Sequence, residues 1–180
     1  GAADIFGLTG GVMEAALRTV YEIITGRDLP WPDLHVPAIV GLEQIKEVAV
    51  KLENVLPEWS ILEGVEVRAA VTSGLAGARK LMEQVEAGAS PYHFIEVMGC
   101  PGGCVTGGGQ PIISAQDRMD INPYVLRAKA TYTEDASKPK RKSHENEEVK
   151  LLYKEFLGEP NSHKAHELLH THYQARPKYQ

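Results

Sequence analysis

The feature that most constrains this chain is a glycine-rich segment that holds both of its cysteines. Cys100 and Cys104 lie four residues apart, and five of the chain's 17 glycines fall between residues 102 and 109. A Cys-x-x-x-Cys pair in such a loop suits a thiolate-bound metal cluster, because glycine lets the backbone pass close to bulky iron and sulfide atoms. An iron–sulfur site usually takes four thiolates. If this loop is a cluster site, the other ligands come from protein outside these 180 residues.

The same loop has simpler interpretations. It could be a glycine-rich turn with two buried cysteines, since cysteine is among the most often buried residue types. A redox-active dithiol usually has the spacing Cys-x-x-Cys, and a phosphate-binding loop would be followed by Lys-Ser/Thr, which does not follow Gly109. A disulfide here would close too short a loop to stabilise much. Reduced thiols in a reducing compartment fit better.

Composition narrows the class of protein. The chain is 43% hydrophobic and 24% charged, so it can bury a core, and its length predicts one domain with an appendage. A net charge of −5 argues against a nucleic-acid module. The sequence contains neither an apolar run of about 18 residues nor a signal peptide. We therefore expect no nucleic acid and no membrane as partner, and a cytoplasmic location.

The first half of the sequence alternates between helix and strand patterns. Apolar residues recur at helical spacing between Gly10 and Gly26, with Thr9 as the expected N-cap. Alternating apolar and polar residues predict strands near 48–52 and 65–69.

A strand–helix–strand unit is predicted over residues 64–98. Its helix begins at Ser73-Gly74 and ends at Gly88, and the stretch 93–98 is typical of a short buried strand. The helix is expected to bury an apolar stripe formed by Leu75, Ala78, Leu81, Met82 and Val85. Open α/β sheets place their sites at the carboxyl ends of parallel strands, which is where the cysteine loop would lie.

The last third of the sequence is more polar. A helix is predicted over 114–130, although Pro123 weakens it, and residues 133–148 are expected to be a linker or a segment draped over another surface. Two short helices are predicted at about 147–157 and 163–171.

The cysteine segment resembles the third signature of the iron-only (di-iron) hydrogenases. That signature reads Glu-Val-Met-x-Cys-Pro-Gly-Gly-Cys-x-x-Gly-Gly-Gly-Gln-Pro, and residues 96–111 match it without a gap. Further stretches resemble the family's preceding block, its strand-to-helix step and its small-subunit segment: residues 5–18, 70–74, 78–81, 141–146, 156–160 and 166–173. The resemblance covers nearly the whole chain.

The resemblance implies a definite cofactor. In that family a 4Fe–4S cubane is joined through a cysteine sulfur to a di-iron unit that carries CO, cyanide and a bridging dithiolate. By motif position Cys100 would be a terminal cubane ligand and Cys104 the ligand that bridges cubane and di-iron unit. Met98, Phe6, Gly7 and Val12 would line the pocket of the di-iron unit. From spacing alone, Phe6, Val12 and Met98 are equally consistent with ordinary core.

The resemblance also implies a fold and partners. We expect an α/β fold: the βαβ-containing half of a hydrogenase catalytic domain over residues 1–131, and a helical, extended small-subunit-like tail over 132–180. The first two cysteine signatures of the family are absent, so the N-terminal part of the catalytic domain is expected as a partner chain or an unlisted portion of the same one. H2 and a ferredoxin-like or other electron carrier are the remaining partners, and a partner could bring the enzyme to the periplasm.

Two clusters outside the loop have both functional and ordinary interpretations. His163, His166 and His170 share one helical face, which suits zinc or an electron relay, but a solvated or interface face is favoured because no cysteine or carboxylate pair completes the set. The basic run 138–142 is most often a solvated face, or it docks an acidic ferredoxin-like surface. The rival functions for the whole chain are a hydrogenase-like iron–sulfur assembly protein and a sensory hydrogenase.

Overall fold

A computed structural model describes residues 1–30 and 45–177 of the protein. The chain divides into two compact units, Gly1–Ser143 and His144–Gln180. Short 3-10 helices occur at Asp4–Gly7 (η1), Pro57–Leu62 (η2), Cys104–Thr106 (η3) and Ser143–Glu145 (η4). Within the described ranges no helix combines the length and apolar character that crossing a bilayer requires.

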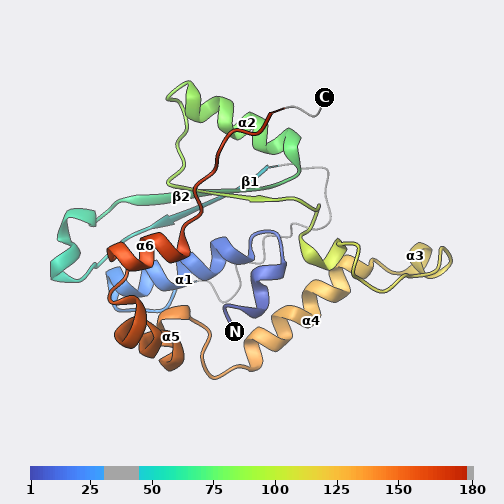
Figure 1. Ribbon diagram of the computed structural model, residues 1–180. Coiled ribbons are helices and arrows are strands. Elements are labelled where there is room, and N and C mark those ends of the chain that lie inside the picture. The colour runs from blue at the N-terminus through green and yellow to red at the C-terminus, as the bar shows by residue number, and fades with distance from the viewer. Residues whose placement is uncertain (31–44, 178–180) are drawn as a thin grey trace. The chain divides into compact units, whose positions relative to one another are not determined.

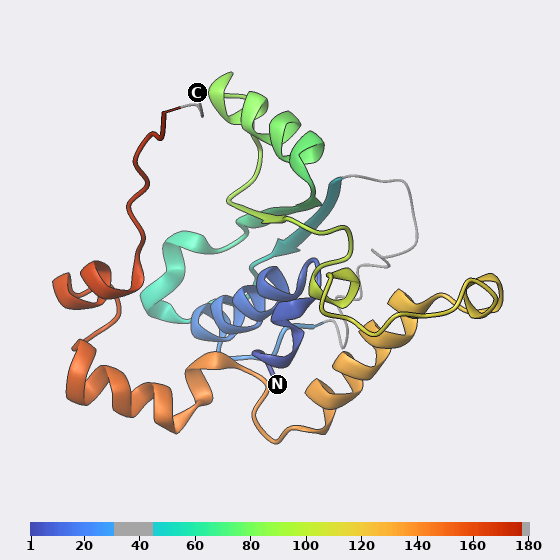
Figure 2. The same ribbon diagram turned by 45° about the vertical axis from the view of Figure 1, so that its right-hand side comes forward.

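The first unit is built on a three-stranded sheet of order β1-β2-β3. Strand β1 (Ile45–Lys51) is antiparallel to β2 (Glu66–Ser73), and β2 is parallel to β3 (Phe94–Met98). Helix α2 (Leu75–Glu86) connects the two parallel strands. The predicted βαβ unit and the α/β fold class are therefore confirmed. Helix α1 and helix α2 lie on opposite sides of the sheet (Figures 1 and 2).

Helix α1 (Gly11–Thr25) forms the main core against the sheet. Its buried stripe is spaced at helical intervals and packs on residues of β1 and β2 and on Leu52. The core residues are Met13, Leu17, Tyr21, Ile24, Val50, Leu52, Ala69 and Val71. Gly26 ends the helix, as predicted, and it does so in a left-handed conformation. Thr9 is not the N-cap: that position is Gly10, and its φ of 90° is one that glycine adopts readily.

Helix α2 differs from its predicted burial. Gly77 and Leu81 are its buried residues, whereas Leu75, Met82 and Val85 are exposed, Leu75 by 87%. The prediction of a continuous buried stripe is therefore wrong. The buried side of α2 is therefore narrow and consists of Gly77 and Leu81. Strand β3 is also less buried than expected, with Glu96 as its buried residue.

The region after the loop contains a short helix α3 (Asp117–Asp120) and a long helix α4 (Pro123–Ser137), not the single helix expected. Pro123 starts α4 instead of weakening a helix, because the first helical position needs no N–H donor. Asn122 caps it by accepting from the Tyr124 N–H at 3.0 Å. Residues 133–137 belong to this helix, and Asp135 is fully buried, so the predicted linker is wrong at its start.

The second unit contains two short helical segments, as predicted. Helix α5 (Glu147–Leu152) continues into a π-helical turn (η5, Tyr153–Leu157), and α6 spans His163–Leu169. Each begins with a side-chain cap: Asn146 accepts from the Glu148 N–H at 2.9 Å, and Ser162 accepts from the Ala165 N–H at 3.2 Å.

Candidate metal centre

The cysteine loop follows directly from the carboxyl end of β3. Met98 ends the strand, and its carbonyl accepts a hydrogen bond from the Gly74 N–H at 2.8 Å, beside the start of α2. Cys100 and Cys104 are both free thiols and both exposed. Among the described residues no group of three or more His, Cys, Asp or Glu side chains is placed to hold a metal ion. The loop therefore offers two thiolates to a cluster, which fits half of the usual four-ligand set.

The N-terminal segment lies against the inner side of this loop, which is its buried side at Gly102 and Gly103. Leu8 and Gly103 form an isolated antiparallel bridge, and the Thr9 N–H donates to the Gly102 carbonyl at 3.2 Å. Gly103 has a φ of +92°, and a Cβ there would lie 2.4 Å from the Gly7 carbonyl oxygen. Glycine is required at this position by both conformation and space.

The predicted pocket residues lie in three elements near the loop. A Cβ added to Gly7 would lie 3.7 Å from the Cys104 Cβ, so this backbone is in contact range of the cysteine. Phe6 in η1 is 47% exposed, and Val12 and Met98 are half-buried. The structure thus brings Gly7 to Cys104, while the role of all four residues around a cofactor stays a prediction.

Glu96, on the strand that leads into the loop, bonds to the start of α1, and the sequence did not predict this role. Its side chain is buried, and its two carboxylate oxygens accept from the Gly10 N–H at 2.6 Å and the Met13 N–H at 2.8 Å. These are unsatisfied donors at the N-terminus of α1, so Glu96 caps that helix from another element and faces the positive end of its dipole. A carboxylate in an otherwise apolar strand was the available sequence signal.

The loop also orders itself through its own polar groups. The Cys104 carbonyl accepts from the Gly107 N–H at 3.0 Å and from the Gln110 Nε2 at 3.2 Å. The Thr106 hydroxyl donates to the Gly103 carbonyl at 3.0 Å. Local hydrogen bonds of this kind compensate for the conformational freedom that the glycines introduce.

A buried ionic cluster ties α1 to α4 within the first unit. Arg18 donates to both carboxylate oxygens of Asp135 at 2.9 Å, and Arg141 donates to the same carboxylate at 2.6 Å. Burial by itself would raise the pKa of Asp135, but the hydrogen bonds from the two arginines outweigh it and lower the pKa to about 2. The Tyr132 hydroxyl donates to Glu14 at 2.8 Å, and burial together with that carboxylate raises the Tyr132 pKa far above its usual range.

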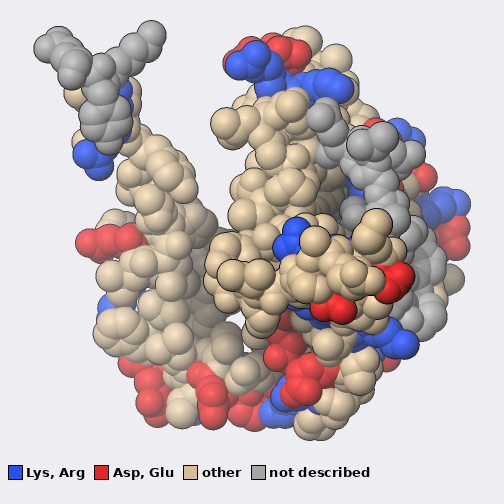
Figure 3. Space-filling view, turned by 90° about the vertical axis from the view of Figure 1, so that its right-hand side faces the viewer, with Lys and Arg blue, Asp and Glu red and all other residues tan. Residues whose placement is uncertain are grey.

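The basic run 138–142 is largely neutralised within the chain. Lys138 pairs with Glu134, Arg141 with Asp135 at 2.6 Å, and Lys142 with Asp28 at 2.6 Å. The face in Figure 3 shows acidic and basic groups intermixed among uncharged residues. These pairings give no support to the run as a docking surface for an acidic carrier.

His166 of α6 and His170, the residue that caps the end of this helix, form a stacked pair. The His166 and His170 rings lie 4.1 Å apart at an interplanar angle of 25°. Among the described residues no group of three or more such donors is placed to hold a metal ion, and the solvated or interface face stays a prediction.

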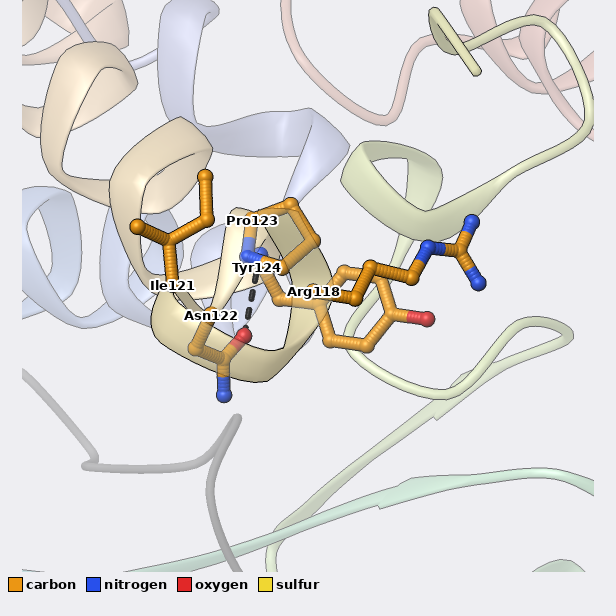
Figure 4. Close-up of a pocket in the computed structure, with 5 residues that line it drawn as sticks. All are labelled: Arg118, Ile121, Asn122, Pro123 and Tyr124. Carbon is orange, nitrogen blue, oxygen red and sulfur yellow. Dashed lines mark hydrogen bonds between the residues drawn. The ribbon is translucent and has the colours of Figure 1, made fainter. Parts of the chain in front are cut away.

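A surface pocket of about 250 Å³ lies at the start of α4. It is lined by Arg118, Ile121, Asn122, Pro123 and Tyr124. Figure 4 shows the Arg118 and Tyr124 side chains projecting to the same side, and the Asn122 cap bond to the Tyr124 N–H. None of the predicted cofactor residues lines it.

The fold and the loop together define an α/β segment that presents two free, exposed thiols beyond the end of a parallel strand. Comparison with protein-family models sharpens this class. Residues 1–108 match the model described as "Iron only hydrogenase large subunit, C-terminal domain", and residues 122–176 match "Iron hydrogenase small subunit". The chain belongs to the iron-only hydrogenase family.

Individual relatives agree. The chain is 44% identical over 178 residues to the NADP-reducing hydrogenase subunit HndD of Solidesulfovibrio fructosivorans, covering 99% of this chain and 28% of that protein. It is 39% identical to iron hydrogenase 1 of Clostridium pasteurianum over 96% of this chain and 28% of the relative. It is also 35% identical to the cytosolic Fe-S cluster assembly factor narfl of Xenopus tropicalis, over 96% of this chain and 32% of that protein. The chain thus spans about a third or less of these relatives.

Solved structures give the same result. The chain matches an FeFe-hydrogenase structure with a TM-score of 0.70 at 40% identity, over 93% of this chain and 44% of that chain. A variant of the FeFe-hydrogenase HydA1 of Chlamydomonas reinhardtii matches with a TM-score of 0.69 at 39% identity, over 93% and 45%.

Proposed function

We propose that this chain is the C-terminal part of an iron-only hydrogenase that interconverts H2 with protons and electrons. The observation that carries the proposal is the loop of residues 96–111, where Cys100 and Cys104 are free, exposed thiols at the end of a parallel strand. They fit a 4Fe–4S cluster linked to a di-iron unit with CO, cyanide and a bridging dithiolate. We propose residues 1–131 as the catalytic part and 132–180 as the small-subunit-like tail.

The protein's contribution is ligation and a shielded surface. Cys100 would hold the cubane at one iron, and the Cys104 sulfur would join the cubane to the di-iron unit. When bound, this cofactor supplies the heterolytic cleavage of H2 and the outward transfer of electrons. Phe6, Gly7, Val12 and Met98 would form an apolar wall that excludes water and competing ligands.

The chain needs partners to complete the site. The remaining thiolates would come from the N-terminal part of the catalytic domain. Two relatives support this, because the chain covers only 28% of each of them. The similarity to a hydrogenase named for NADP reduction supports a nicotinamide-linked electron carrier, and a ferredoxin-like carrier is the alternative. We propose a cytoplasmic location, with a periplasmic one as the alternative because one relative is a periplasmic hydrogenase large subunit.

The second candidate is an iron–sulfur assembly factor without a di-iron unit, favoured by the 35% identity to narfl over nearly the whole chain. In such proteins we expect Ser before the Gly-Cys pair, where this chain has Gly102, and this difference favours the hydrogenase. A sensory hydrogenase with low turnover is a third candidate.

Infrared spectroscopy of the intact, iron-loaded protein separates these functions. The hydrogenase predicts absorption bands of iron-bound CO and cyanide together with rapid H2 turnover. Bands with slow turnover would assign the sensory role. A cluster-loaded protein without such bands would overturn the hydrogenase proposal and leave the assembly factor.

A further inference from the structure

The backbone after Cys104 needs support from outside the loop. Residues 105–111 contain three consecutive glycines, of which Gly108 and Gly109 are exposed. Val105 is the buried side chain of this stretch, and Ile112 just beyond it is 96% exposed. Apolar packing therefore cannot hold the whole stretch in one conformation.

Arg127 of α4 supplies a support at both ends of this stretch. Its Nη1 donates to the Val105 carbonyl at 2.8 Å, and its Nη2 donates to the Pro111 carbonyl at 2.9 Å. The planar guanidinium is a rigid fork, so the two carbonyls are held at a set separation. One side chain thus holds the backbone on both sides of the three glycines, at Val105 within η3 and at Pro111.

Arg127 is itself held in place by the rest of α4. The next residue, Ala128, is buried in a cluster with Ile5, Leu8 and Val105. The far end of the helix is anchored by the ion pair between Asp135 and Arg18. The guanidinium therefore connects the loop to a fixed helix instead of moving with the loop.

We propose that Arg127 is a positioning residue for Cys104, acting through the Val105 carbonyl one residue beyond it. Cys100 is held differently: its carbonyl accepts from the Gly103 N–H at 2.9 Å, and Gly103 is bridged to Leu8. Val105 is adjacent to Cys104 but five residues from Cys100, so loss of the Arg127 contact should affect Cys104 more directly than Cys100. The inference rests on the proposed function, in which Cys104 supplies the bridging sulfur. The role of Arg127 is to hold that sulfur at a defined position relative to Cys100.

The test compares Arg127→Gln and Arg127→Lys in the full-length protein with the matched control Lys129→Gln, an exposed position on the same helix. Neither replacement can bridge two carbonyls as a planar fork. A hydrogen bond from a charged donor shifts a local opening equilibrium by about tenfold. Hydrogen exchange of the amides in 105–110, measured without the cluster, should therefore rise about tenfold in both variants, while α1 amides and Lys129→Gln stay at the wild-type rate.

The second readout is the electron paramagnetic resonance signal of the reduced cluster in the loaded protein. Positioning predicts a broadened or shifted signal in both Arg127 variants and an unchanged one in the control. Unchanged exchange overturns the inference, and so does faster exchange with a wild-type signal, which would mean a merely structural contact. A failure of the proposed function would be seen separately, as missing CO and cyanide bands in the wild type. The exchange rates and the cluster signal could still be compared between the wild type, the Arg127 variants and the control.

Discussion

The two sides of the cysteine loop differ in burial and in the contacts that the rest of the chain makes with them. The inner side, formed by Gly102, Gly103 and Val105, is buried and bonded to the N-terminal segment. The outer side, formed by Cys100, Pro101 and Cys104, is exposed. The inner side is packed within the protein. The outer side presents two sulfur atoms, and the described residues add no third metal ligand to them.

This difference suggests that the support of the loop and the full set of metal ligands come from different parts of the protein. The chain supports the loop with residues from three different places: Glu96 on β3, Gly103 in the loop itself and Arg127 on α4. Under the proposed function it leaves the rest of the donor set to another segment. Changes on the outer side should affect the cofactor, and changes on the inner side should affect stability first.

The largest effect is expected from Cys104→Ser. Serine is a poor ligand for soft iron–sulfur centres, so we expect complete loss of the di-iron infrared bands in the intact protein with folding retained. Circular dichroism provides the folding check. Full retention of the bands would refute the assignment of Cys104.

Gly103→Ala should break the inner side. Its Cβ would approach the Gly7 carbonyl oxygen to 2.4 Å at a φ of +92°. We expect a loss of about 3 kcal/mol in the unfolding free energy, measured in urea. Gly108→Ala is the matched control, because nothing lies within 4 Å of its added Cβ. Equal effects of the two substitutions would contradict the tight inner packing.

Glu96→Ala removes the cap that joins β3 to α1. Two buried N–H groups lose their acceptor, and we expect the free energy of α1 opening to fall by about 2 kcal/mol, measured by hydrogen exchange. Glu86→Ala, at the exposed end of α2, should have no effect on α1. Wild-type exchange at Gly10 and Met13 in the Glu96 variant would show that the carboxylate is not their partner.

A smaller effect is expected from acid at the ionic cluster. The folded-state pKa of Asp135 is lowered from 3.8 to about 2, so its stabilising contribution is present above about pH 4 and is lost as the pH falls toward 2. The urea midpoint of the wild type should fall over this window more steeply than that of Asp135→Asn. Parallel profiles for the two proteins would argue against the Arg18–Asp135 pairing.

Much of the fold could be predicted because its signals are local. The stripe of α1, the alternation of β1 and β2, and the helix between β2 and β3 all follow from side-chain periodicity. The two cysteines and their glycines likewise identified the loop. The errors arose where a long-range contact decided the outcome. Thr9 had the chemistry of a cap, but Glu96 from a distant strand took that role.

Burial along the chain was mispredicted for the same reason. Asp135 lies in a sequence stretch that is polar throughout, yet Arg18, 117 residues earlier, makes its burial favourable. The apolar residues of α2 were expected to be buried, yet no described element covers Leu75. Pairings between distant segments leave no periodic trace in the sequence, so Arg127 also escaped notice.

The central claim is that Cys100 and Cys104 hold iron jointly with donors from another part of the protein. Iron-edge anomalous diffraction from crystals of the intact, cofactor-loaded protein tests it most directly. We expect iron within bonding distance of both sulfurs and further ligands from a different segment on the same cluster. Two bare sulfurs, or a disulfide between them, with the iron elsewhere would contradict the account.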